Sequence, residues 1–170
     1  EDPHETKNLA GSSDHAEVLE EMRRACREWM LAIRDCGCLP EPQIHSRSEG
    51  GSAYDMARDP ERYPMDQILS CAETASSLEA GATETLLGCM SDADPAVRYW
   101  SAMGLLMRGE RAVRKGHALL REGLDDEDEC VRIVSAEALC RFGQSTDVRL
   151  GMPVLVNLAD AEEHGPYVAT

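Results

Sequence analysis

Two arginines, each preceded by an acidic turn, are the residues whose types and spacing most directly suggest chemistry. Arg98 lies in DADPAVRYWSAMGLLMRG at residues 92–109, and Arg132 lies at the same place in DEDECVRIVSAEALCRFG at residues 126–143. A guanidinium group exposed at such a turn could bind an anionic ligand. A regularly repeated arginine is explained more simply by a structural need that each copy shares. We therefore interpret Arg98 and Arg132 as structural residues and keep the anion contact as the alternative.

The two stretches predict a repeated unit of two helices separated by the acidic turn. They are identical at eight of eighteen aligned positions with an offset of 126 − 92 = 34, and leucines at helical spacing precede each of them. Asp94 and Asp128 suit the N-cap position, where a carboxylate accepts free backbone N–H groups, and Pro95 suits the first helical position. One helical hairpin cannot bury its apolar face alone, so copies must stack. The predicted repeats are 82–115, 116–149 and a partial copy at 150–170.

No other group of residues has the spacing of a catalytic or metal site. Cys36 and Cys38 flank a glycine, but no second pair of ligands accompanies them at zinc-binding spacing. The seven cysteines are scattered, and we interpret them as small, buried, reduced side chains. The acidic run at 125–129 lacks the central glycine and terminal glutamate of an EF-hand loop, which favours a solvated turn. The sequence therefore predicts no catalytic, cofactor-binding or metal-binding residue in this chain.

Composition favours an all-helical protein and disfavours two classes of partner. Lys and Arg number 17 against 32 Asp and Glu, which gives a net charge of −15 and argues against nucleic acid or an anionic membrane surface. The chain has a single Phe and many helix-forming residues. No apolar run approaches the length of a membrane span, and no signal peptide is recognised. Because the first residue is Glu1 rather than Met, we expect a piece of a longer protein.

The segment 1–38 is predicted to be an entry segment followed by one long amphipathic helix. The helix should run from Asp14 to about Cys36. Apolar residues recur on one side of it at helical spacing: Val18, Met22, Ala25, Cys26, Trp29 and Ile33. Such a stripe predicts that this helix packs against other elements.

The segment 39–64 is predicted to be an irregular linker, and 65–170 to hold the repeats. The linker is rich in Pro, Gly and Ser. Its His45 and Arg47 could face a substrate pocket on another domain, although solvated side chains are the more ordinary interpretation. A helix from Asp66 to about Leu78 should precede the first repeat.

The partial third repeat is expected to leave an apolar face uncovered. Asp160 follows Asp126 at the same offset that separates the first two copies, but the register is then lost, and the next helix is expected to begin near Tyr167. Repeat arrays without a polar terminal cap tend to associate or fray.

Both copies carry D-x-D-x-x-V-R-x-x-S-A-x-x-L, which resembles HEAT repeats in the short form of phycobilisome-lyase-type repeat proteins. The resemblance implies that turn aspartates and helix arginines link neighbouring repeats. Asp94, Arg98, Asp128 and Arg132 would then be structural repeat positions. The predicted fold class is all-α, a short HEAT-like α-α solenoid preceded by a long helix and an irregular linker.

The first part of the chain carries a second resemblance. Residues 2–10 read DPHETKNLA, a long helix with Trp29 and Met30 follows, and residues 35–41 read DCGCLPE. This order is similar to the C-terminal end of arylsulfatase-type sulfatases, some of which continue into HEAT-like repeats with V-R-Y-W, as at residues 97–100 here. The resemblance spans nearly the whole chain, so residues 1–38 are expected to correspond to the end of a sulfatase catalytic domain.

The sulfatase resemblance implies an activity for a parent chain and a non-catalytic role for this segment. The parent would hydrolyse sulfate esters with calcium and a formylglycine made from the cysteine of C-x-P-S-R. Cys38 begins CLPEP, without the required Ser and Arg. The segment would support the catalytic domain of the same chain or contact a protein partner or a second copy. Sulfatases of this kind are often exported, although nothing in this segment fixes a compartment.

Two other functions stay open at this point. A free-standing HEAT-repeat scaffold would bind a protein partner through an exposed groove and have no enzymatic activity. An independent enzyme of unknown class would need a deep pocket with converging polar groups, and no motif in the sequence supports it.

Overall fold

The protein is all-α, as its sequence predicts. The computed structural model describes residues 2, 4 and 6–165, and every regular element within them is helical. The α-helices are α1 (Ala16–Ile33), α2 (Glu41–Arg47), α3 (Ala53–Arg58), α4 (Met65–Ser77), α5 (Thr83–Cys89), α6 (Pro95–Met107), α7 (Glu110–Lys115), α8 (His117–Glu122), α9 (Glu129–Phe142), α10 (Ser145–Leu158) and α11 (Ala161–His164). Single 3-10 turns lie at Ser13–His15, Ala80–Ala82 and Gly123–Asp125.

The first of two compact units, Glu1–Asp35, is built around α1. The long helix predicted here is confirmed, although it ends at Ile33 rather than near Cys36, where Arg34 takes a left-handed backbone conformation with φ of 60°. No residue of α1 is buried. Its apolar stripe is exposed instead, by 53% at Val18, 66% at Met22, 66% at Trp29 and 44% at Ile33. The described residues of its own unit therefore leave this stripe uncovered.

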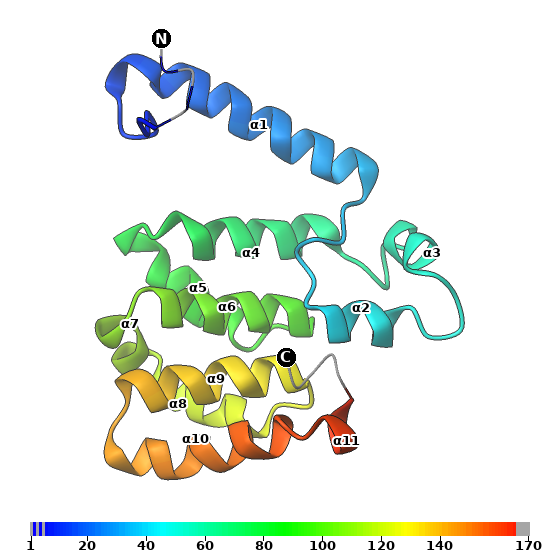
Figure 1. Ribbon diagram of the computed structural model, residues 1–170, viewed down its shortest axis with the longest axis vertical. Coiled ribbons are helices and arrows are strands. Elements are labelled where there is room, and N and C mark those ends of the chain that lie inside the picture. The colour runs from blue at the N-terminus through cyan, green and yellow to red at the C-terminus, as the bar shows by residue number, and fades with distance from the viewer. Residues whose placement is uncertain (1, 3, 5, 166–170) are drawn as a thin grey trace. The chain divides into compact units, whose positions relative to one another are not determined.

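The second unit, Cys36–Thr170, holds helices α2 to α11. Helices α4, α6 and α9 lie side by side and pack in that order (Figure 1). A second set of helices covers them, since α5 packs on α6, and both α8 and α10 pack on α9. The most deeply buried core side chains are at most 1% exposed, among them Leu86, Val97, Leu105, Val131 and Leu139. This arrangement is solenoid-like, with each helix burying its apolar face against its neighbours.

The helices recur at the offset that the sequence indicates. Helices α6 and α9 begin at Pro95 and Glu129, and 129 − 95 = 34. Helices α5 and α8 begin at Thr83 and His117, and 117 − 83 = 34 again. The third copy differs, because α10 is continuous through Leu150, the position equivalent to Gly116 between α7 and α8.

Helices α4 and α6 approach each other closely at Gly104. A Cβ atom at this position would lie 3.0 Å from the Cβ atom of Ala75 and 3.1 Å from its Cα atom. Such distances are shorter than ordinary van der Waals contact, so two small residues set the spacing of these helices.

The predicted linker, 39–64, is more ordered than its composition suggests. It contains α2 and α3, and it belongs to the second unit. Met56 and Tyr63 are both fully buried, whereas Tyr54 is 64% exposed. The prediction of an irregular segment is therefore wrong for these two short helices, which are stabilised by burial rather than by local propensity.

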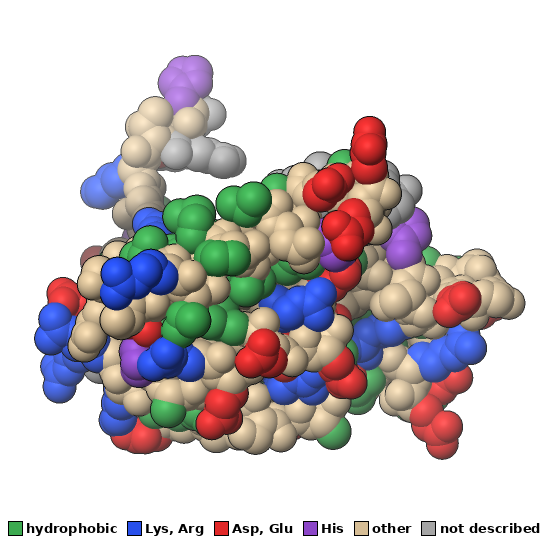
Figure 2. Space-filling view, turned by 90° about the horizontal axis from the view of Figure 1, so that it is seen from below, with side chains coloured by type: hydrophobic (Ala, Val, Ile, Leu, Met, Phe, Trp, Pro, Cys, Tyr) green, Lys and Arg blue, Asp and Glu red, His purple; other side chains and the backbone are tan. Residues whose placement is uncertain are grey.

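At the other end of this unit, α10 presents apolar side chains to solvent. Leu150, Met152 and Val156 are 42%, 46% and 67% exposed. Figure 2 looks onto this end and shows hydrophobic side chains gathered among charged ones. Asp160 then caps the short helix α11, and the predicted helix start at Tyr167 lies outside the described residues. No helix in the described part of the chain has the length and apolarity to cross a membrane.

Candidate functional site

The two acidic turns form nearly identical structures at the starts of α6 and α9. In each turn the first aspartate accepts the backbone N–H of the second at 2.9 Å: Asp92 from Asp94, and Asp126 from Asp128. The second aspartate is the N-cap, and its carboxylate accepts an N–H of the first helical turn, as Asp94 does from Ala96 at 2.8 Å. The helix dipole favours a negative charge at this position. The remaining carboxylate oxygens are available for partners on other elements.

Arg98 links α6 to the acidic turn of the following copy. Its Nε and Nη2 atoms donate to the two carboxylate oxygens of Asp126, both at 2.8 Å, and Nη1 donates to the carbonyl of Asp92 at 2.9 Å. The side chains of Arg98 and Asp126 are only 11% and 12% exposed. The hydrogen bond to Asp126 is the main cause of a raised pKa for Arg98, despite the opposing effect of burial. A bidentate contact of this kind holds the arginine side chain in one position and favours its charged form.

Arg132 occupies the equivalent position, but its contacts are limited to its own acidic turn and helix. Its Nη1 atom donates to the carbonyl of Asp126 at 2.8 Å, and Nη2 lies 3.5 Å from the carboxylate of Glu129. Asp160 is the equivalent of Asp126 in the next copy, and there it accepts the N–H of Glu162 at 3.0 Å. The two arginines therefore differ because the third copy departs from the register of the first two.

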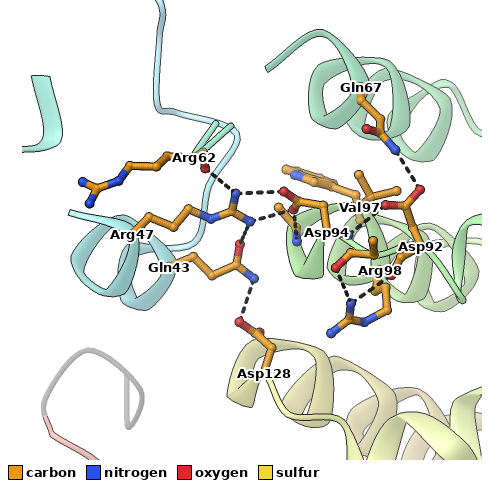
Figure 3. Close-up of polar contacts among 12 residues, drawn as sticks. Gln43, Arg47, Arg62, Gln67, Asp92, Asp94, Val97, Arg98 and Asp128 are labelled. Atoms are coloured by element: carbon orange, nitrogen blue, oxygen red, sulfur yellow. Dashed lines mark hydrogen bonds and ion pairs between the residues drawn. The ribbon is translucent and has the colours of Figure 1, made fainter. Parts of the chain in front are cut away.

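Helix α2 bridges the two helix caps (Figure 3). Arg47 donates from Nη2 and Nη1 to the two carboxylate oxygens of Asp94, at 2.6 and 2.9 Å. One helical turn earlier, Gln43 donates to Asp128 at 3.1 Å and is only 2% exposed. Nη1 of Arg47 also donates to the carbonyl of Arg62 at 2.9 Å. We call Gln43, Arg47, Asp94 and Asp128 the cap bridge.

The cap bridge corrects the interpretation of Arg47 made from sequence, whereas His45 lies outside it and stays partly exposed. Arg47 is neither solvated nor directed at a pocket, because its side chain is 13% exposed in the pair with Asp94. The side chain of His45 is 53% exposed and lies 3.8 Å from the carboxylate of Glu41. Sequence reasoning missed Gln43. The one available signal was its spacing of four residues from Arg47, which places both side chains on the same face of a helix.

The V-R-Y-W stretch holds the linker as well as the neighbouring turn. Trp100 donates from its indole nitrogen to the carbonyl of Cys38 at 2.7 Å. The ring of Tyr99 packs edge-on against that of Trp100, with centroids 5.5 Å apart. Burial raises the pKa of the Tyr99 hydroxyl. Val97 is 1% exposed, so each of these side chains has a packing or anchoring role.

Two buried cysteines of the second unit have thiols of low reactivity. Burial is the main cause that raises the pKa of the Cys71 and Cys130 thiols to about 12, so both stay protonated at neutral pH. Cys38 is also buried, whereas Cys26 is exposed, so the cysteines are not uniformly buried as the sequence suggested. Within residues 2, 4 and 6–165 no three His, Cys, Asp or Glu side chains are grouped as metal ligands. The charged side chains of the two acidic turns are engaged in ion pairs and hydrogen bonds with other described residues.

A second buried carboxylate lies at the start of α10. Asp147 is 1% exposed and accepts the backbone N–H of Gln144 at 2.7 Å in a capping box. His117 Nε2 lies 3.0 Å from Oδ2 of Asp147, and Arg121 Nε lies 3.8 Å from Oδ1, an ion-pair distance too long for a hydrogen bond. Burial acts to raise the pKa of Asp147, but the Gln144 N–H, His117 and Arg121 together outweigh it and lower the pKa.

Asp147→Asn should therefore cost stability that depends on pH. Because the folded-state pKa lies below the unfolded value of about 3.9, ionised Asp147 stabilises the fold fully above that value, and the contribution disappears as pH falls through the folded-state pKa. We expect the variant to lose about 1 kcal/mol at pH 7 and less at about pH 3, which lies below the unfolded-state pKa. Urea unfolding followed by circular dichroism at both pH values measures the difference. An equal loss at both would show that the carboxylate charge is irrelevant.

Comparisons with protein-family models, with curated proteins and with solved structures found no match. The assignment of a role to this chain therefore depends on its own geometry and on the motifs of its sequence.

Proposed function

We propose that this chain is the non-catalytic, HEAT-like C-terminal segment of a sulfatase, and that α1 attaches it to the catalytic domain of the same chain. The observation that carries this proposal is the apolar stripe of α1, which the described residues of its own unit leave uncovered. Val18, Met22, Trp29 and Ile33 lie on an 18-residue helix with no buried residue. An isolated helix of this length is only marginally stable in water. Such a helix needs a partner that covers its apolar face.

The parent's catalytic domain is the partner that the sequence favours. The D-P-x-E-x-x-N-L-A motif that begins at Asp2 is followed, after the 3-10 turn Ser13–His15, by α1. In the sulfatases it resembles, this motif closes the catalytic domain, so α1 would pack on that domain. The parent would supply formylglycine and calcium, and the second unit would contribute support. The structural use of Arg98 and Arg47 is consistent with support, since both arginines are occupied by buried ion pairs.

The alternative is a free-standing HEAT-like scaffold with no enzymatic activity, and the outer face of α10 favours it. The exposed Leu150, Met152 and Val156 form an apolar surface at one end of the repeats. Repeat proteins commonly use such faces for protein contacts. A protein partner or a second copy of the chain would then cover α10.

The reading frame upstream of the codon for Glu1 separates the two proposals. A frame that continues upstream through C-x-P-S-R and a set of calcium-binding acids would support the sulfatase segment. A start codon within a few residues of Glu1 would exclude it and leave the scaffold.

If the parent exists, α1 should be protected by it. We expect α1 amide hydrogens to exchange about a hundredfold more slowly in the complete parent than in this chain alone, equivalent to about 2.7 kcal/mol of docking. Trp29→Ser in the parent should remove most of this protection, because it takes away the largest apolar side chain of the stripe. Amides of α9 serve as the internal control and should exchange equally in both proteins. Equal exchange of α1 in both would contradict the docking role.

A further inference from the structure

A cavity of about 440 Å³ opens between the end of α6, helix α7 and the segment before α5. Its wall has an apolar part formed by Leu78, Met107 and Ala112. Thr83 and three cationic side chains complete it: Arg108, Arg111 and Lys115. No carboxylate-bearing residue is among those that line it in the described part of the chain.

The three cationic side chains differ in the hydrogen bonds and ion pairs that they already form with other residues. Arg108 uses Nη1 and Nη2 to donate to the carbonyls of Ala75 and Thr74, both at 2.8 Å, which caps the end of α4. Its Nε atom is buried and has no hydrogen-bond partner within the described residues. Lys115 forms an ion pair with Glu84. Arg111 is exposed, and its side chain makes no hydrogen bond or ion pair with any described residue.

This local charge is opposite in sign to that of the whole chain. The three cations less the carboxylate of Glu84 leave 3 − 1 = 2 positive charges at the cavity, in a protein of net charge −15. Several other arginines neutralise their charge with carboxylates, as Arg98 does with Asp126 and Arg114 does with Glu110. A concave surface lined by one sign of charge concentrates ions of the other sign. An anion is therefore the ligand that this cavity suits.

We propose that the cavity binds a small organic anion with an apolar body, such as a phosphate monoester or a carboxylate. The anionic group would lie against Arg111 and Lys115. The apolar body would pack on Leu78, Met107 and Ala112. The volume is within the usual range of small-molecule sites, about 300–1,000 Å³. This inference concerns a different surface from α1 and does not depend on a sulfatase parent.

Titration calorimetry with phenyl phosphate tests the proposal on the chain as it stands. We expect one saturable site at millimolar or tighter affinity, with weaker binding at about 0.5 M salt because the contact is ionic. Inorganic phosphate should bind more weakly because it leaves the apolar wall unused. Benzoate in place of phenyl phosphate reports whether a carboxylate is preferred.

Arg111→Ala should weaken phenyl phosphate binding about tenfold, since a charged hydrogen bond is lost. Arg149→Ala is the matched control, because Arg149 is an exposed arginine on α10 outside the cavity lining. It removes the same charge and should leave the affinity unchanged. Absence of saturable binding up to about 10 mM, or an equal loss in both variants, would overturn the proposal. Equal affinities for phenyl phosphate and inorganic phosphate would overturn the role of the apolar wall.

Discussion

Arg98→Ala should lower the free energy of unfolding of the second unit by about 3 kcal/mol. The substitution leaves the carboxylate of Asp126, 12% exposed, without its bidentate partner. It also removes a hydrogen bond to the carbonyl of Asp92. A buried charge that loses its partner is far more costly than the loss of a surface ion pair. Guanidinium chloride unfolding at pH 7, followed by circular dichroism, measures the change.

Arg132→Ala is the matched control and should cost only about 1 kcal/mol. The side chain of Arg132 is 23% exposed, and its ion pair with Glu129 lies within the same helix. Arg98→Lys should recover only part of the loss, because lysine keeps the charge but cannot form the bidentate contact. Equal effects of the two alanine variants would mean that the link between copies adds nothing to the local contacts.

Gly104→Ala should destabilise the second unit by about 2 kcal/mol, although alanine is the better helix former. The new methyl group would meet Ala75 at 3.0 Å from its Cβ atom and 3.1 Å from its Cα atom. Relief requires α4 and α6 to move apart, because the Cα atom belongs to the backbone. The clash therefore outweighs the gain of about 1 kcal/mol in helix propensity.

Gly88→Ala should change the stability in the opposite direction, although the chemical change is the same. Gly88 lies on α5, and a Cβ atom there would meet nothing within 4 Å. We expect a stabilisation of about 0.5–1 kcal/mol. The free energies of unfolding of the two variants, measured by thermal unfolding and compared at a common temperature, should thus differ by about 3 kcal/mol. A stabilising Gly104→Ala would show that the helices separate at little cost.

The sequence was sufficient for the helices that carry strong local signals. The apolar stripe of α1, the capping aspartates of α6 and α9, and the constant offset between the first two copies all appear in the structure. The stripe and the caps depend on residues within a few turns of each other. Hydrophobic periodicity and helix-capping residues can be recognised in a sequence when the residues concerned lie within a few helical turns of each other.

The sequence alone did not predict the two linker helices or the residues that pair with the acidic turns. Gln43 and Asp128 are 85 residues apart, and Arg47 and Asp94 are 47 apart. No local pattern encodes such a pairing. Helices as short as α2 form because tertiary contacts hold them. The amphipathic stripe of α1 likewise predicted a contact surface, but it carries no information about what covers that surface.

The cap bridge also has a consequence for how the repeats respond to force and heat. In most solenoids each unit touches only its neighbours, so units can unfold one after another from either end. Here one short helix is hydrogen-bonded to the N-termini of two successive repeat helices through Gln43 and Arg47. Separating α6 from α9 would have to break at least one of these contacts in addition to the packing between the two helices. We therefore expect the first two copies to move together as one rigid block. The third copy, which α2 does not contact through these caps, is the part that can bend.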